Sequence, residues 1–276
     1  METSRRNSNV RLVACLVDAD DIDKSDYRFV IGNQHAKYVI TEPGTFLGAE
    51  EDRTFEPVLF GELFPPFLTG DWNQAYVSRD PVTGKATFVK IETAELPGVK
   101  NCWHPLKFNE MDFTRQERLR QGVHVSTHPI LNDGKSVLAR STHWPWEIPY
   151  VEAETTTYRL LQDSEVGPKF LGHITEGRSG RVIGFVTEFI EGSRPAEPRD
   201  IKGFEKALRN LHKLGIKLGD TNRFNFLVRD EHDVVLVDFE AAKNRYSQEE
   251  LEEEMDNLMS CLEDTSFLGG VYTINN

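Results

Sequence analysis

The stretch that most restricts how this chain can fold is LHKLGIKLGDTNRFNFLVRDEHDVVLVDFE, residues 211–240. It continues an amphipathic segment that predicts a helix over 199–215, with Gly215 as its stop signal. The apolar face of that helix would carry Phe204, Leu208, Leu211 and Leu214. Two short apolar runs, FNFLV and DVVLVDF, follow and predict strands. The sequence therefore predicts a helix, a polar loop and two strands in direct succession.

Polar residues stand where the first of these strands should begin, and they allow two interpretations. Asp220 and Asn225 precede the strands, and Asp238 closes them. Asp and Asn are common in turns, so each of these residues alone favours a capped turn. Taken together at these spacings, they can converge on one cation, and such oxygen ligands suit Mg²⁺. A magnesium site at Asn225 and Asp238 is therefore one prediction.

The remaining periodicity predicts an α+β protein with a sheet-rich N-terminal part and a helical C-terminal part. Strands are expected over 10–17 and 27–40, and a loop-dominated connection over 41–70. Hairpins are expected over 74–92 and 122–141, a helix over 148–164, two strands over 169–192 and an acidic helix over 247–262. We predict three regions: a β-rich extension over 1–120, a second region over 121–191 and a third over 192–276.

Composition limits the partners and the compartment. The chain has 276 residues and a net charge of −13, which argues against general binding of DNA or RNA. Its local basic patch is Arg115, Arg118 and Arg120, for which we favour a solvated helix face but keep RNA contact open. No run approaches the roughly 20 apolar residues of a membrane span, and no signal peptide is expected. Three scattered cysteines predict no disulfide framework and favour a cytoplasmic protein.

The order of these segments resembles the protein-kinase-like fold, which includes aminoglycoside phosphotransferases. The resemblance covers about 120–245 and implies a two-lobed protein with a sheet-rich N-terminal lobe and a small truncated helical C-terminal lobe. It matches Asp220 to the catalytic acid, and Asn225 and Asp238 to the metal ligands. KSVLARS matches the strand of the ATP lysine, and Glu154 matches the acid that pairs with that lysine.

Departures from the kinase pattern weaken the expected grip on ATP. Arg140 stands at the lysine position, Leu218 at the supporting histidine, and Glu240 at the third position of the D-F-G motif. No G-x-G-x-x-G loop precedes Arg140. Glu154, Asp220, Asp238 and Glu240 would form a strongly negative pocket that needs a cation. A guanidinium would suit it, and Arg140 could neutralise Glu154 internally.

Over its full length, including FPPFLTGDWNQAYVSRDPVTGK, WPWEIPYVEAET and VGPKFLGHITE, the chain also resembles the fungal arginine-containing cyclodipeptide synthases. That resemblance implies an enzyme of secondary metabolism that condenses arginyl-tRNA with a second aminoacyl-tRNA to a cyclo(Arg-Xaa) diketopiperazine. It implies no cofactor, since aminoacyl esters are already activated, and no membrane or DNA partner. The expected catalytic residues are Asp220, Asp238 and Glu240.

The resemblance also implies which residues bind the substrate and which bind tRNA. The residues expected to bind the substrate are Glu154, Arg140, Asn225 and Phe224, and those expected to bind tRNA are Arg115, Arg118 and Arg120. Phe224 could equally be ordinary core. Two alternatives stay open: a small-molecule phosphotransferase that uses ATP and Mg²⁺, and a catalytically inactive kinase-like (pseudokinase) module.

Overall fold

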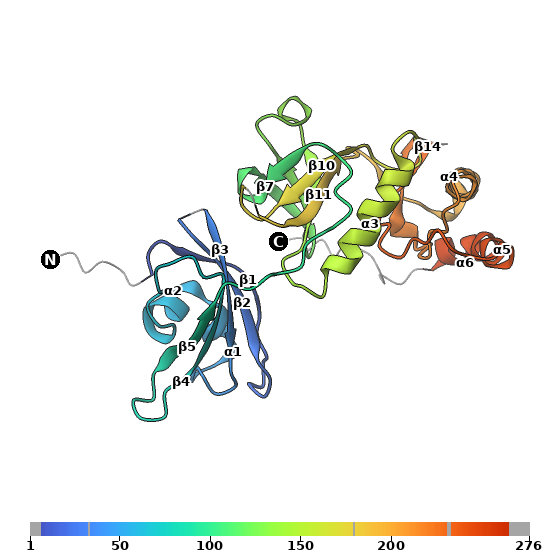
Figure 1. Ribbon diagram of the computed structural model, residues 1–276. Coiled ribbons are helices and arrows are strands. Elements are labelled where there is room, and N and C mark those ends of the chain that lie inside the picture. Colours follow the sequence, from blue (N-terminus) through green and yellow to red (C-terminus); the bar gives the residue numbers. More distant parts are fainter. Residues whose placement is uncertain (1–6, 33, 179, 231–232, 265–276) are drawn as a thin grey trace. The chain divides into compact units, whose positions relative to one another are not determined.

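The computed structural model describes residues 7–32, 34–178, 180–230 and 233–264. The chain divides into two compact units, 1–96 and 97–276, which are described separately (Figure 1). Within the described residues the strands form three sheets and the remaining elements are mainly short helices. The predicted α+β class is therefore confirmed.

The first unit is a mixed sheet that is covered by short helical segments. Its strand order is β1-β2-β3-β4-β5, antiparallel except for the parallel pair β3 and β4. The strands are β1 (Val10–Leu16), β2 (Ser25–Ile31), β3 (His35–Thr41), β4 (Gln74–Arg79) and β5 (Ala86–Glu92). Between β3 and β4 come α1 (Glu50–Thr54), α2 (Glu56–Val58) and the π-helical turn η1 (Leu59–Leu63). Phe29, Phe60 and Phe64 meet in its core, where aromatic rings lie at offset and edge-on contacts.

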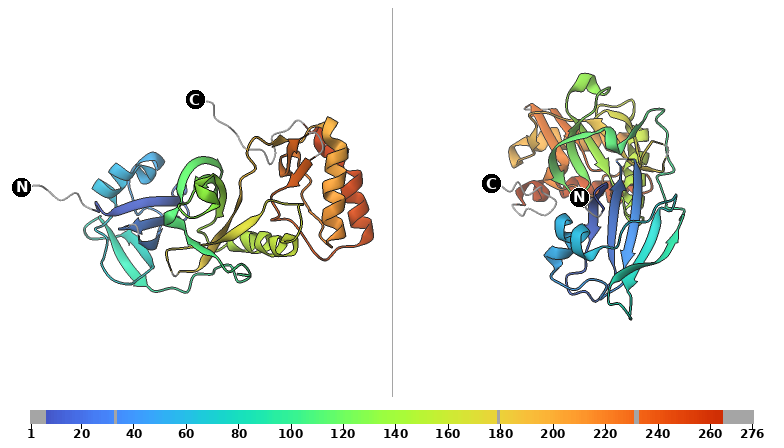
Figure 2. Two further views of the ribbon diagram at one scale, coloured as in Figure 1. Left: turned by 90° about the horizontal axis from the view of Figure 1, so that it is seen from above. Right: turned by 90° about the vertical axis from the view of Figure 1, so that its left-hand side faces the viewer.

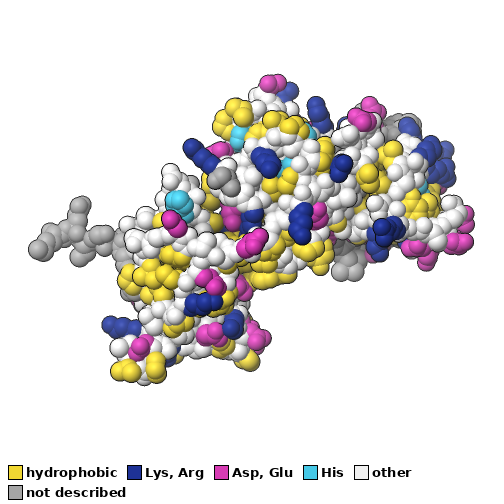
Figure 3. Space-filling model, in the orientation of Figure 1, with side chains coloured by type: hydrophobic (Ala, Val, Ile, Leu, Met, Phe, Trp, Pro, Cys, Tyr) yellow, Lys and Arg dark blue, Asp and Glu magenta, His cyan; other side chains and the backbone are white. Residues whose placement is uncertain are grey.

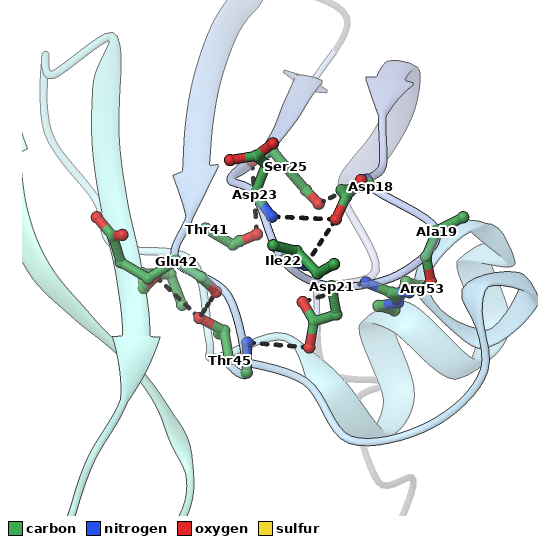
Figure 4. A network of polar contacts seen from close by, with 12 residues as sticks. Asp18, Ala19, Asp21, Ile22, Asp23, Ser25, Thr41, Glu42, Thr45 and Arg53 are labelled. Carbon is green, nitrogen blue, oxygen red and sulfur yellow. Dashed lines mark hydrogen bonds and ion pairs between the residues drawn. The ribbon is translucent and has the colours of Figure 1, made fainter.

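A polar network ties the β1–β2 loop of the first unit to its helical segment (Figure 4). Asp18 accepts hydrogen bonds from the backbone N–H groups of Ile22 and Asp23, which closes the loop on itself. Asp21 accepts from Gly44 N and from the buried guanidinium of Arg53 in α1. These contacts give a buried cation an acidic partner and fix the loop, so they have a structural explanation.

The sheet of the second unit has the order β6-β10-β11-β9-β8-β7 among the described residues. Its strands are β6 (Lys107–Asn109), β7 (Thr114–Arg120), β8 (Val123–Thr127), β9 (Val137–Ser141), β10 (Phe170–Thr175) and β11 (Val182–Glu188). Helix α3 (Ile148–Leu161) packs on β11 (Figure 1). Val151 and Tyr158 are buried on the inner face of α3, as the helical period predicts.

The C-terminal part of the second unit pairs helices with a small sheet. Its helices are α4 (Ile201–Lys213), α5 (Gln248–Asp256) and α6 (Leu258–Glu263), and its strands are β12 (Arg194–Pro195), β13 (Phe226–Asp230) and β14 (Asp233–Leu236). Figure 2 shows α4 beside α5 and α6, and α4 also packs on β14. Phe204, Leu208 and Leu211 are fully buried on one face of α4. The prediction that Leu214 belongs to this face is wrong, because α4 ends at Lys213 and Leu214 is 42% exposed. The predicted helix, loop and hairpin of this region are therefore confirmed.

Three features differ from the sequence predictions. Residues 41–70 contain α1, α2 and η1, because Leu59, Phe60 and Phe64 bury against the sheet. The basic segment 115–121 is mostly strand β7, not a helix face, because it pairs with β8. The acidic helix breaks at Asn257 into α5 and α6.

The division into units also falls earlier than the predicted boundary between 120 and 121. β6 pairs with β10, and β7 pairs with β8, so residues 107–120 belong to the sheet of the second unit. Over 97–276 the chain is one compact unit, across the predicted boundary between 191 and 192. Within the described ranges, the helices are too short or too polar for any of them to cross a membrane.

Candidate functional site

The loop between α4 and β13 holds Asp220 in a fixed orientation. The backbone N–H of Asn222 donates to Asp220 Oδ1 at 3.1 Å, and Asn225 Nδ2 donates to Oδ2 at 3.1 Å. Asn225 is buried and also donates to the Asp220 carbonyl oxygen at 3.3 Å. Asp220 itself is exposed. The carboxylate is therefore both oriented and accessible, as a general base or ligand requires.

A buried glutamate of the predicted acidic helix, Glu254, supports this loop. Glu254 in α5 accepts hydrogen bonds from Leu218 N at 3.2 Å and Gly219 N at 2.6 Å. Its Oε2 also lies 2.7 Å from His212 Nε2 in α4. The side chain of Glu254 is only 4% exposed, and that of Leu218 packs in the core. Glu254 thus holds the backbone at the start of the Asp220 loop.

The sequence contains a signal for Glu254. Leu251, Leu258 and Leu262 are buried at helical spacing on the same face as Glu254. An acid on an apolar helix face requires a buried partner. The glycine at position 219 is also explained by the structure. Its φ is +83°, and a Cβ there would lie 2.4 Å from the Ala241 carbonyl oxygen. The loop passes too close to that backbone for any side chain.

Asp238 follows β14 and has an unusual backbone conformation. Its φ is +62°, a left-handed value that is uncommon outside glycine. Val237 N donates to the Asn225 carbonyl oxygen at 2.9 Å, which connects the two predicted metal ligands through the backbone. The Asp238 Oδ2 atom lies 2.5 Å from Arg120 Nη1. Among the described residues, the buried Oδ1 atom has no hydrogen-bond partner.

Arg140 joins two further acids to the site. Its Nε atom lies 3.1 Å from Glu154 Oε1, and its Nη2 atom lies 3.5 Å from Glu240 Oε2. The predicted pairing of Arg140 with Glu154 is confirmed. The Glu154 side chain, from α3, is 4% exposed, and that of Glu240 is 40% exposed. Glu154 is therefore an internal anchor, whereas Glu240 can meet a ligand.

The acids form one electrostatic cluster, within which two arginines are the counter-ions. Carboxylate oxygens of Glu154, Asp238 and Glu240 lie within 4.8 Å of one another, so this set could hold a metal ion. Burial, with the charge of Asp238, raises the pKa of Glu154 to about 7 despite the opposing effect of Arg140. Burial and Asp238 also raise the pKa of Glu240. Three carboxylates against two guanidiniums leave the cluster short of one cation or one proton.

The hairpin of β7 and β8 ends on this cluster. Gly122 has a φ of +70°, and a Cβ there would lie 2.4 Å from the Ser141 carbonyl oxygen and 2.8 Å from Arg140 Nη1. The hairpin end therefore packs directly on Arg140 and on the β9 backbone. Arg120, the residue before the turn, reaches Asp238.

The other two arginines of the predicted tRNA patch stay at the surface. Arg115 and Arg118 are exposed along β7, and their charges, after burial, lower the pKa of His124 to about 4. A register shift between Arg118 and Arg120 breaks the alternation of the strand. The predicted patch is thus divided between a surface part and a part that reaches the acidic cluster.

Phe224 lies next to the Asp220 loop and is half-buried, outside the described hydrophobic core. The guanidinium carbon of Arg223 lies 4.9 Å from the centre of its ring. Part of the Phe224 side chain is therefore accessible beside the loop. Its role toward a second amino acid stays a prediction.

A groove of about 350 Å³ borders the site on another face of α3. Ala153, Thr157 and Leu160 form its α3 wall, and Lys243 and Arg245 supply its cations. Lys243 pairs through its backbone with Lys217, three residues before Asp220. The groove therefore combines a wall of small, hydroxyl and apolar side chains with positive charge near the Asp220 loop.

Together these features define a carboxylate-rich site with guanidinium counter-ions in a mixed α+β protein. Comparison of the sequence with protein-family models gave no match, and comparison with curated proteins gave none.

Proposed function

We propose that the second unit has a protein-kinase-like arrangement and acts as a tRNA-dependent cyclodipeptide synthase. Its substrates are arginyl-tRNA and a second aminoacyl-tRNA, and its product is a cyclo(Arg-Xaa) diketopiperazine of secondary metabolism. The proposal needs no ATP and no metal, because the ester bond of each substrate is already activated.

The observation that carries the proposal is the identity of the counter-ions in the acidic cluster. Asp238 is engaged by Arg120, and Arg140 is engaged by Glu154 and Glu240. A kinase needs the acid for Mg²⁺, yet here Arg120 already contacts it. A cluster that holds guanidiniums suits an arginyl substrate.

The reaction follows from the nucleophile and the leaving group. The α-amine of one aminoacyl ester attacks the carbonyl carbon of the other ester. An amide bond forms, the ester C–O bond breaks, and the tRNA hydroxyl leaves with the proton that the amine gives up. The free amine of the dipeptidyl ester then attacks the remaining ester carbonyl, which closes the ring and releases the second tRNA.

Two carboxylates are suited to carry that proton. Asp220 is exposed and oriented by Asn222 and Asn225. Glu240 is partly exposed, and its pKa is raised by burial and by Asp238. A base works best when its pKa approaches the working pH, so Glu240 suits proton abstraction and Asp220 suits orientation of the amine.

The tRNA must approach a chain with a net charge of −13. On the face in Figure 3, Lys and Arg side chains are spread over the second unit with Asp and Glu among them. We assign phosphate contacts to Arg115 and Arg118 on β7. The cations of the α3 groove, Lys243 and Arg245, are a second surface for the acceptor end.

The test is a reconstitution with purified protein. Charged tRNAs should give a cyclic arginine dipeptide by mass spectrometry, and RNase should abolish it. Product formation from free arginine and ATP, or product that survives RNase, would refute the proposal. In tRNA-binding assays, R115E/R118E and K243E/R245E should each weaken binding and reduce its salt dependence.

A metal-dependent phosphotransferase is the second candidate, since the oxygens of Glu154, Asp238 and Glu240 lie within 4.8 Å of one another. That function predicts a higher melting temperature with Mg·ATP, because a ligand that binds only the native state stabilises it. No shift at millimolar nucleotide would exclude it. An inactive module predicts that Asp220→Ala changes no product in the producing organism.

A further inference from the structure

The carboxylate of Asp238 is only half satisfied by its internal partner. Arg120 contacts Oδ2 at 2.5 Å, whereas Oδ1 is buried and has no hydrogen-bond partner among the residues that the structure describes. A carboxylate and a guanidinium can form two parallel hydrogen bonds, which is their strongest arrangement. The site therefore binds a guanidinium in a form that leaves one acceptor unused.

The two arginines of the cluster differ in how firmly they are held. The side chain of Arg140 is 13% exposed and lies between Glu154 and Glu240. The side chain of Arg120 is 39% exposed, reaches in from a hairpin end and forms an ion pair with Asp238. A long side chain gains conformational entropy when it is released to solvent. Arg120 can thus leave the cluster at a lower cost than Arg140.

We propose that Asp238 is the seat for the guanidinium of the arginyl substrate, and that Arg120 is an internal occupant that this guanidinium displaces. This inference rests on the proposed function. The incoming guanidinium would use both oxygens of Asp238, and the half-exposed Glu240 would line its approach. Arg120, once displaced, would return to the surface of β7 beside Arg118.

Displacement also gives a physical basis for choosing arginine over lysine. A planar guanidinium offers paired donors to both carboxylate oxygens, whereas an ammonium is a point charge that cannot match that fork. Both cations must compete with Arg120, so only the ligand with the stronger arrangement gains from the exchange. A ligand must therefore bind Asp238 more strongly than Arg120 does, and the preference for arginine follows from the difference between the affinities of the two ligands.

The test measures binding of L-argininamide and L-lysinamide to the full-length protein by calorimetry. Arg120→Ala should bind argininamide about tenfold more tightly than wild type, because the competent state no longer competes with an internal guanidinium. Its gain for lysinamide should be smaller. Asp238→Asn should lose argininamide binding.

Arg229→Ala is the matched control, because Arg229 has a similar exposure of 37% and an ion pair with Asp233 outside the cluster. It should bind like wild type. Equal argininamide affinity in Arg120→Ala and wild type would overturn the inference, as would tighter binding of Mg²⁺ but not of argininamide. If Arg120→Ala does not fold by circular dichroism, Arg120→Gln is judged by the same criterion.

The same data separate this inference from the function on which it rests. Tighter argininamide binding by Arg120→Ala, without turnover of charged tRNAs, would support the guanidinium site at Asp238 and refute the synthase activity. Turnover of charged tRNAs, with the same argininamide affinity in Arg120→Ala and wild type, would support the synthase activity and refute the guanidinium site at Asp238.

Discussion

Removing the Glu254 carboxylate should destabilise the loop that carries Asp220. Glu254→Ala leaves the N–H groups of Leu218 and Gly219 and the ring of His212 without their acceptor. A buried donor left unpaired costs about 1–3 kcal/mol, so two backbone donors and one ring predict a loss of about 3–5 kcal/mol in the free energy of unfolding. Glu254→Gln keeps one acceptor oxygen and should lose about 2 kcal/mol.

Urea unfolding followed by circular dichroism measures this loss, and Glu253→Ala is the control, since Glu253 is the exposed neighbour on α5. Activity on charged tRNAs should fall in both Glu254 variants by about tenfold or more, because a small displacement of Asp220 spoils the attack geometry. Hydrogen exchange at Gly219 reports the loop directly. If Glu254→Ala costs less than about 1 kcal/mol, or if Gly219 exchanges as in wild type, the support that we assign to Glu254 is wrong.

Three further predictions concern the two units. Burial, with the charges of His104 and Lys107, lowers the pKa of His173 to about 4 from 6.5. The neutral His173 ring should stabilise the fold fully above pH 6.5, and the free energy of unfolding should fall by about 3 kcal/mol as the pH drops toward 4. His173→Gln should make the free energy of unfolding, from urea titrations, depend less on pH over this range. The same pH dependence in His173→Gln and wild type would contradict this prediction. Gly122→Ala should cost about 2 kcal/mol or more, since a Cβ at positive φ meets the β9 backbone, and a thermal shift within error would refute this close packing. Phe64→Ala should cost the first unit about 3–5 kcal/mol by opening its aromatic core, and a urea midpoint like that of wild type would show that this core tolerates the cavity.

Local patterns in the sequence were enough to predict most elements. Helices α3 and α4, the two hairpins and the strands around Asp238 were predicted because apolar periodicity and turn residues act over neighbouring positions. The polar set Asp220, Asn225 and Asp238 was also visible, because these residues interrupt an otherwise regular pattern. The pair of Arg140 with Glu154 was predicted from the kinase-like pattern, in which a helix acid pairs with the strand cation.

The contacts between segments that lie far apart in the chain could not be predicted from the sequence. Glu254 lies over 30 residues from the backbone that it supports, and nothing local distinguishes it from the exposed acids beside it except the apolar face on which it lies. Arg120 belonged to a surface patch in the sequence, and only the pairing of β7 with β8 brought it to Asp238.

The sequence by itself therefore determined the α+β class, most of the elements and the acids of the site, because these depend on local periodicity and residue chemistry. The tertiary structure alone decided that Arg120 neutralises Asp238 and that Glu254 supports the Asp220 loop. Those choices depend on strand pairing and helix packing, which join residues far apart in the chain.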